Sequence, residues 1–180
     1  MTAIAQQQAQ TDNFAGIRQK AGNIQVVEFV LGKELFAIDL FDVKEVVEYT
    51  TITKLPNVPP YIKGIIDLRG EITTIIDLKQ RLNITESAVT SAESSRIVVL
   101  DDKITGTKIG ILVDDVSSVS TFESAQVDFT SASVTKDDTA IIGIIKRKIK
   151  VKDKEKNELI IWIDITKLLA DIGGCLGKTA

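Results

Sequence analysis

The side chains of this chain that could bind a divalent metal are three pairs of adjacent aspartates. Carboxylate oxygens are the ligands that Ca²⁺ and Mg²⁺ take in proteins. None of the pairs has EF-hand spacing, and each lies beside an expected strand end or loop, where aspartate commonly shapes a turn. We therefore expect turn residues and no metal at Asp101-Asp102, Asp114-Asp115 and Asp137-Asp138.

Other catalytic chemistry has little support in the sequence. The chain contains no histidine, which is the commonest general base and metal ligand. Its single cysteine, Cys175, has only Lys178 as a basic neighbour, so we expect neither a disulfide nor a reactive thiol. The glycines of residues 173–179 lack the spacing of a phosphate-binding loop. These features argue against an enzyme and against any cofactor.

The most distinctive segment of the chain is residues 52–78, ITKLPNVPPYIKGIIDLRGEITTIIDL. This segment holds all three prolines of the chain. A rigid loop leads into two apolar runs, residues 64–68 and 72–76, which predict a hairpin that turns at Arg69-Gly70. Asp77 then has the position of a helix N-cap.

The only strongly basic field lies in residues 146–156, KRKIKVKDKEK. They carry a net charge of +5, which leaves −8 on the rest of the chain. Ile149 and Val151 alternate with the charges, as expected for a solvated hairpin. The alternative is contact with an acidic partner or an anionic membrane surface. We expect no nucleic-acid binding, because the segment lacks aromatic residues and the basic field is small.

The elements that position these residues are expected to be mainly β-strands. Isoleucine and valine number 42 against 13 leucines, and β-branched side chains favour a pleated sheet. Residues 24–40 predict a hairpin broken at Gly32-Lys33. Residues 42–49 fit either a helix or a strand, and we favour a strand that starts near Val43 or Lys44. Trp162 is expected to pack within the last strand.

The second half of the chain resembles the first. Residues 36–46 align with 109–119, Gly64-Ile65-Ile66 aligns with Gly143-Ile144-Ile145, and Ile76-Asp77-Leu78 aligns with Ile163-Asp164-Ile165. These matches predict a duplicated β unit. We place the halves at residues 24–84 and 96–171, with a polar loop near 85–95 between them. Residues 1–23 are predicted to be a disordered tail, and 172–180 a C-terminal tail.

Several motifs together resemble one family, the CheW chemotaxis coupling proteins and the related regulatory domain of the chemotaxis histidine kinase. The motifs cover most of the chain, at residues 33–39, 43–46, 52–64, 67–70, 75–78, 110–119 and 163–169. The resemblance implies two small five-stranded SH3-like β-barrel halves in tandem, with short helices. It also implies a non-catalytic adaptor that couples chemoreceptor cytoplasmic tips to the histidine kinase in signalling arrays.

The resemblance places partner contacts at or near Val43, Glu45, Lys63, Gly64, Arg69 and Val119. We hypothesise that Glu45 pairs with Arg69 and holds its guanidinium in a fixed fork while part of it stays available to a partner. A purely structural ion pair is the alternative. The chain departs from the family pattern at Asp67, where Asn is usual, at Thr73-Thr74, in place of Val-Pro, in a longer N-terminal tail, and in the long basic hairpin.

The sequence shows neither a secretory signal nor an apolar run of about 18 residues, so we expect a cytoplasmic protein that reaches the membrane only indirectly, through receptor arrays. Two other functions stay open at this point. One is a coupling protein of a non-chemotaxis array, and the other is a small-molecule-binding β-barrel.

Overall fold

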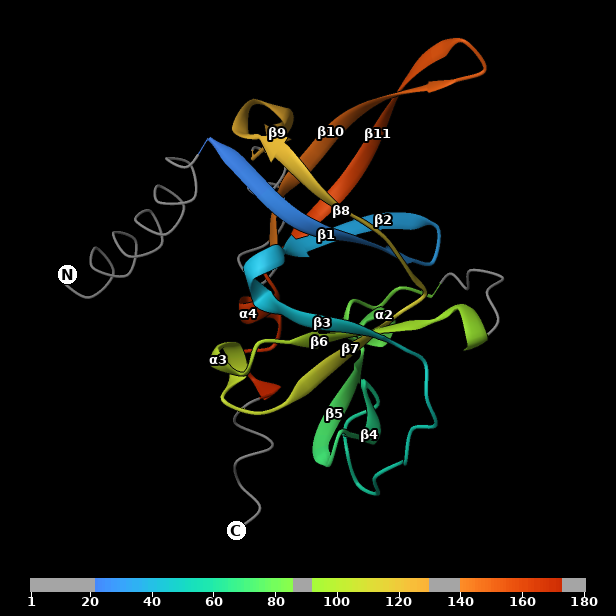
Figure 1. Ribbon diagram of the computed structural model, residues 1–180, viewed down its shortest axis with the longest axis vertical. Helices are drawn as coiled ribbons and strands as arrows, with labels where there is room; N and C mark the ends of the chain where they lie inside the picture. Colours follow the sequence, from blue (N-terminus) through green and yellow to red (C-terminus); the bar gives the residue numbers. More distant parts are fainter. Residues whose placement is uncertain (1–21, 86–91, 130–139, 173–180) are drawn as a thin grey trace, which may run out of the picture.

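The fold consists of two β-sheets with short helices between them, as the computed structural model shows (Figure 1). Residues 22–85, 92–129 and 140–172 are described. The upper, six-stranded sheet has the order β8 (Asp115–Glu123), β1 (Asn23–Leu31), β2 (Glu34–Asp39), β11 (Lys154–Ile163), β10 (Ile141–Val151), β9 (Val127–Asp128). The lower, five-stranded sheet has the order β3 (Val43–Glu48), β6 (Arg96–Leu100), β7 (Ile109–Val113), β5 (Glu71–Asp77), β4 (Ile62–Leu68).

The helices are all short, and aspartates cap them. Within the described residues, the α-helices are α2 (Leu78–Arg81), α3 (Asp102–Thr105) and α4 (Ile165–Leu168). The 3₁₀ turns are η1 (Leu40–Asp42), η2 (Ala92–Ser94) and η3 (Ser124–Gln126). The carboxylate of Asp77 accepts a hydrogen bond from the backbone N–H of Gln80, as expected for the N-cap of α2, and Asp164 does the same for α4.

Hydrophobic side chains fill both faces of each sheet. The largest cluster lies between the two sheets and includes Phe29 and Ile38 from the upper sheet with Ile76 and Ile111 from the lower one. The outer concave face of the upper sheet is filled around Trp162, which is 1% exposed, and that of the lower sheet around Ile75. Two-sided burial explains why strands such as β6, RIVVL, are almost continuously apolar.

The two sheets have the same internal order. Taken in the order of the lower sheet, β3, β6, β7, β5 and β4 correspond to β8, β1, β2, β11 and β10 of the upper sheet. The parallel pair of each sheet, β5 with β7 and β11 with β2, occupies the same place. The register also shifts at matching glycines, Gly64 in β4 and Gly143 in β10. These correspondences coincide with the internal sequence matches.

Each sheet nevertheless takes strands from both halves of the chain. β1 and β2 lie in the upper sheet with β8 to β11, whereas β6 and β7 lie in the lower sheet with β3 to β5. The halves 24–84 and 96–171 therefore follow the sequence repeat but not the division into sheets. This exchange joins the halves, since neither could complete its sheet alone.

Several boundaries can be compared with the sequence. The hairpin at Gly32-Lys33, the strand from Val43 and the hairpin at Arg69-Gly70 are confirmed. Two tail boundaries were wrong: Asn23 already pairs with Glu123 in β1, and Ile172 is fully buried in the core between the sheets. Residues 1–21, 86–91, 130–139 and 173–180 lie outside the described part, and with them Cys175 and Asp137-Asp138.

Candidate functional site: an arginine held at a hairpin turn

The β4–β5 hairpin turns over two residues that both have left-handed backbone conformations. Arg69 has φ 54° and Gly70 φ 83°, and Leu68 pairs with Glu71 to close the turn. Such two-residue turns match the twist of the flanking strands. The carboxylate of Asp67 accepts a hydrogen bond of 2.7 Å from the backbone N–H of Gly70. Asp67, whose charge was noted as unusual, thus stabilises the turn that presents Arg69.

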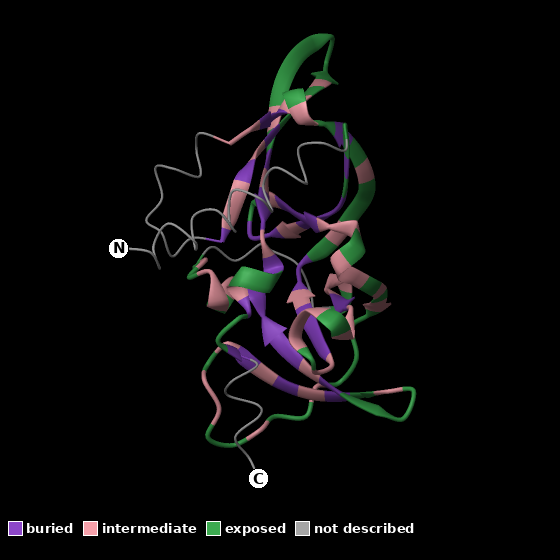
Figure 2. Cartoon of the chain, turned by 90° about the vertical axis from the view of Figure 1, so that its left-hand side faces the viewer, coloured by how far each residue is buried: buried purple, intermediate pink, exposed green. Residues whose placement is uncertain are grey.

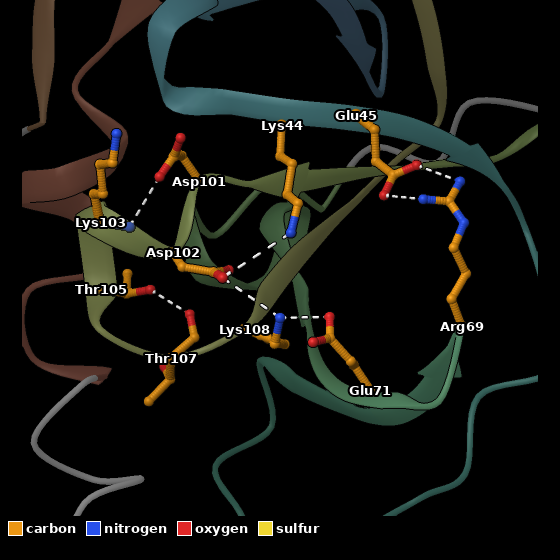
Figure 3. A network of polar contacts seen from close by, with 10 residues as sticks. All are labelled: Lys44, Glu45, Arg69, Glu71, Asp101, Asp102, Lys103, Thr105, Thr107 and Lys108. Carbon is orange, nitrogen blue, oxygen red and sulfur yellow. Dashed lines mark hydrogen bonds and ion pairs between the residues drawn. The ribbon is translucent and has the colours of Figure 1, made fainter.

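Arg69 and Glu45 form the bidentate pair that was hypothesised (Figure 3). Arg69 Nη1 donates to Glu45 Oε1 at 3.0 Å, and Nη2 donates to Oε2 at 2.8 Å. The arginine side chain is 74% exposed, against 23% for the glutamate. The carboxylate therefore acts as the anchor, and the guanidinium keeps a wide exposed surface in a fixed orientation.

The position of this pair follows from the sheet. Glu45 lies on β3 and Arg69 follows β4, and these are the two edge strands of the lower sheet. The sheet curls enough for the ion pair to bridge one edge strand and the end of the other. The pair therefore fixes the β4–β5 turn against β3, which is a structural role beside any contact with a partner.

Alternating charges continue from this pair along the same end of the sheet. Lys108 donates a short hydrogen bond to Glu71 and lies 3.4 Å from Asp102, and Lys44 lies 4.0 Å from Asp102. The hydrogen bond to Glu71 raises the pKa of Lys108, with smaller effects from Asp102, although desolvation opposes the shift. Lys108 therefore stays charged throughout the neutral pH range.

A small cavity of about 60 Å³ lies among these side chains. Ligand pockets for small molecules usually measure some 300–1,000 Å³. This cavity is too small for a metabolite, and its lining combines three cations with three anions, Lys44, Arg69, Lys108, Glu45, Glu71 and Asp102. The arrangement is suited to binding a partner at the surface rather than to enclosing a ligand.

The other predicted contact residues lie in different surroundings. Val43 is half-buried and packs against the core between the sheets. Lys63 is half-buried on β4. Val119 is 60% exposed but lies on β8 of the upper sheet. The structure thus brings together Glu45 and Arg69, while the roles of Val43, Lys63 and Val119 stay predictions.

Gly64 is buried, and its place in the fold explains why it is glycine. Its φ is +149°, and a Cβ atom there would lie 2.2 Å from the backbone oxygen of Thr53. The strand bridge between Thr53 and Ile65 brings the proline-rich segment this close to β4. Gly64 therefore lets that segment pack on the hairpin, and a direct contact with a partner stays a prediction.

Sequence reasoning missed Lys44, Glu71 and Lys108, and it treated Asp102 as a turn residue after weighing a metal site. The one sequence signal for Lys44 and Glu71 is that they lie close to Glu45 and Arg69 along the chain. Lys108 has no such signal. Asp101 caps α3 by accepting a hydrogen bond from the backbone N–H of Lys103, which confirms its turn role. Within the described ranges no group of three or more His, Cys, Asp or Glu side chains could hold a metal.

Asp114 also has a structural role, which joins the two sheets. It is 4% exposed, and its carboxylate accepts hydrogen bonds of 2.7 Å from Lys79 Nζ and from the backbone N–H of Gly32. Lys79 belongs to α2, which packs against the core between the sheets, and Gly32 belongs to the β1–β2 turn of the upper sheet (Figure 1). This buried pair fixes the relative position of the sheets, and with it the exposed arginine.

Comparison with known proteins identifies relatives over most of the chain. Residues 25–173 match the family profile of the CheW-like domain. The chemotaxis protein CheW of Bacillus subtilis is 33% identical over 151 residues, which are 83% of this chain and 88% of the relative. The chemotaxis protein CheW of Treponema pallidum is 30% identical, over 81% of this chain and 82% of the relative.

A solved structure has the same fold. The scaffolding protein TtCheW from Thermoanaerobacter tengcongensis aligns with a TM-score of 0.65 at 37% identity, over 81% of this chain and 92% of that protein. The mainly β architecture with two SH3-like halves is thereby confirmed. Among the described residues, no helix is long and apolar enough to span a membrane.

Proposed function

The chain belongs to the CheW-like domain family, and from this premise we propose that it is a non-catalytic adaptor that couples chemoreceptor cytoplasmic tips to the chemotaxis histidine kinase. Its place of action would be the cytoplasm, within receptor arrays. The observation that carries the proposal is the guanidinium of Arg69, which Glu45 fixes in a bidentate fork while it stays largely exposed.

The geometry favours recognition of another protein in three respects. The fork is pre-organised, so less side-chain entropy is lost when a partner binds. Arginine is one of the residues that most often dominates the energy of an interface. The neighbouring charges alternate in sign, so a partner would be selected by charge pattern rather than by net charge. The receptor tip is the partner that we assign to this end of the lower sheet.

An adaptor must bind both partners at once, which gives the first test. We expect the full chain to form a ternary complex with a receptor cytoplasmic fragment and the regulatory domain of the cognate histidine kinase. Mass photometry or gel filtration would detect it. Arg69→Glu is expected to remove the receptor fragment but to keep the kinase domain, because the upper sheet and the rest of the surface are unchanged.

Micromolar affinities in solution would suffice, because an array adds avidity. If the folded protein bound neither cognate partner at concentrations well above the micromolar range, the coupling role would be contradicted. A non-chemotaxis array would then be the next system to assay.

A further inference from the structure

The β10–β11 hairpin extends well beyond the sheet that contains it. β10 pairs with β9 only at Ile144 and Ile145, and β11 pairs with β2 only at Ile160, Ile161 and Trp162. Within the described chain, the backbone of residues 146–159 forms strand pairs only within this range. This two-stranded segment, which we call the basic ribbon, projects at the top of Figure 1 and is largely exposed in Figure 2.

The two faces of the basic ribbon differ. Directly opposed residues of an antiparallel pair lie on the same face. One face carries Lys146, Lys148 and Lys150; Lys146 pairs with Asp128 and Lys150 lies opposite Glu155, whereas Lys148 lies opposite Asn157. On the other face, Lys156 lies opposite Ile149 and Lys154 opposite Val151. Near the tip, this second face thus combines two lysines with two β-branched apolar side chains, and Val151 is 46% exposed. Closer to the sheet, the same face holds Arg147, which donates hydrogen bonds to Glu158 and Glu28.

The edge of β11 is open along the same residues. A groove of about 320 Å³ lies beside β11, where β11 extends past the first residues of β2. Its lining includes residues from both faces of β11, Lys156 and Leu159, as well as Leu35 at the start of β2 and Ile149 of β10. Leu159 is 54% exposed. A groove that reaches both faces at a strand edge has the shape that an added strand would fill.

We propose that the open edge of β11, residues 154–159, binds an extended acidic segment of a partner protein as an additional β-strand. Acidic side chains at two alternate positions of the segment would meet Lys154 and Lys156, and the next position on that face would hold a neutral side chain beside Glu158, which accepts a hydrogen bond from Arg147. The side chains between them would lie beside Glu155, Asn157 and Leu159, where neutral or apolar groups fit and acidic ones are repelled by Glu155. One apolar side chain would enter the groove between Leu35 and Leu159.

The charge distribution favours such a segment over a membrane. A bilayer presents one plane, whereas the ribbon divides its lysines between two faces, with Lys146, Lys148 and Lys150 on one and Lys154 and Lys156 on the other. Membrane-surface elements also use aromatic anchors, and the ribbon has none. The backbone edge and the groove, in contrast, fit an extended chain.

Lysines on an open edge are also a device against edge-to-edge aggregation. They repel a second copy of this ribbon, which carries the same charge, but attract an acidic strand. Protection against self-association and selection of an acidic partner are therefore the same electrostatic property. Binding measurements are needed to distinguish an edge that only resists self-association from one that also binds a partner strand.

The test uses the full chain and a fluorescein-labelled octapeptide of Thr and Val with Glu at two alternate positions. We expect saturable binding by fluorescence anisotropy and slower amide hydrogen exchange at residues 154–159. The double variant Lys154→Glu/Lys156→Glu should weaken binding at least about tenfold. The matched control Lys148→Glu/Lys150→Glu makes the same charge change on the other face and should cost no more than about threefold, through long-range charge alone.

Two further probes complete the design. A peptide N-methylated at every residue keeps its charge but cannot donate backbone hydrogen bonds along either edge, so its affinity should fall at least about tenfold if a strand is added. Equal losses in both double variants, or equal binding of the N-methylated peptide, would overturn the proposal. So would binding to phosphatidylglycerol vesicles without binding to the peptide. None of these results depends on the receptor or the kinase, so failure here is distinguishable from failure of the coupling role.

Discussion

Reversal of the charge at Arg69 is expected to abolish receptor binding while the protein stays folded. In Arg69→Glu, the new carboxylate faces that of Glu45, so a repulsive pair replaces the bidentate ion pair. Because the arginine side chain is 74% exposed, the ion pair should contribute no more than about 1 kcal/mol to stability. The affinity for a receptor fragment, in contrast, should fall at least about 100-fold, as for the loss of a charged hot-spot residue. Calorimetric titration and a thermal melt would measure the two effects.

The exchange variant Glu45→Arg/Arg69→Glu distinguishes the two roles of the pair. It restores an ion pair between β3 and the β4–β5 turn, so the melting temperature should return close to that of the original protein. Receptor affinity should stay low, because the turn now presents a carboxylate. The matched exchange Glu71→Lys/Lys108→Glu alters a neighbouring exposed pair and should change affinity by less than about tenfold. If the Glu45/Arg69 exchange restored affinity as well, the pair would be purely structural.

Removal of Arg147 is expected to cause the largest loss of stability. Arg147 Nη1 donates to Glu28 Oε1 at 2.8 Å, and its Nε and Nη2 donate to Glu158. Glu28 is fully buried, and its second carboxylate oxygen has no hydrogen-bond partner among the described residues. Burial lowers the pKa of Arg147, but hydrogen bonds to Glu158 and Glu28 outweigh it and raise the pKa overall. The cation is therefore permanent.

Arg147→Met leaves the carboxylate of Glu28 in the core without its counter-charge. Breaking a buried pair in this way costs about 3–5 kcal/mol, which urea unfolding would measure. The double variant Glu28→Gln/Arg147→Met should recover a large part of the loss, because no uncompensated charge remains. Lys148→Met, one residue along β10 and exposed, is the control and should change stability by less than about 0.5 kcal/mol. A loss below about 1 kcal/mol in Arg147→Met would contradict this account.

Local elements were predictable from the sequence because their signals are local. Gly32-Lys33 and Arg69-Gly70 mark tight turns, Asp77 caps a helix, and apolar runs define the strands between them. The fork at Arg69 was predicted only through the family resemblance. Nothing in the spacing of Glu45 and Arg69 shows that the sheet curls enough for an ion pair to bridge β3 and the turn after β4.

The features that the sequence did not predict depend on long-range pairing. The parallel pairs β2 with β11 and β5 with β7 place strands of one half in the sheet of the other. An internal repeat alone is compatible both with this exchange and with one separate sheet for each half. The charge network at Lys108 arises because β7 lies next to β5 in that exchange. Ile172 was assigned to a tail because one isoleucine among glycines carries no periodic signal, although it fills the core between the sheets.

The central claim, that the protein couples receptors to the kinase through Arg69, is tested most directly by kinase autophosphorylation. Receptor cytoplasmic fragments and the cognate histidine kinase would be reconstituted with the original protein, with Arg69→Glu and with the Glu45/Arg69 exchange variant. We predict strong activation by the original protein and none above background by either variant, although both stay folded. Absence of activation by the original protein, or full activation by Arg69→Glu, would contradict the account.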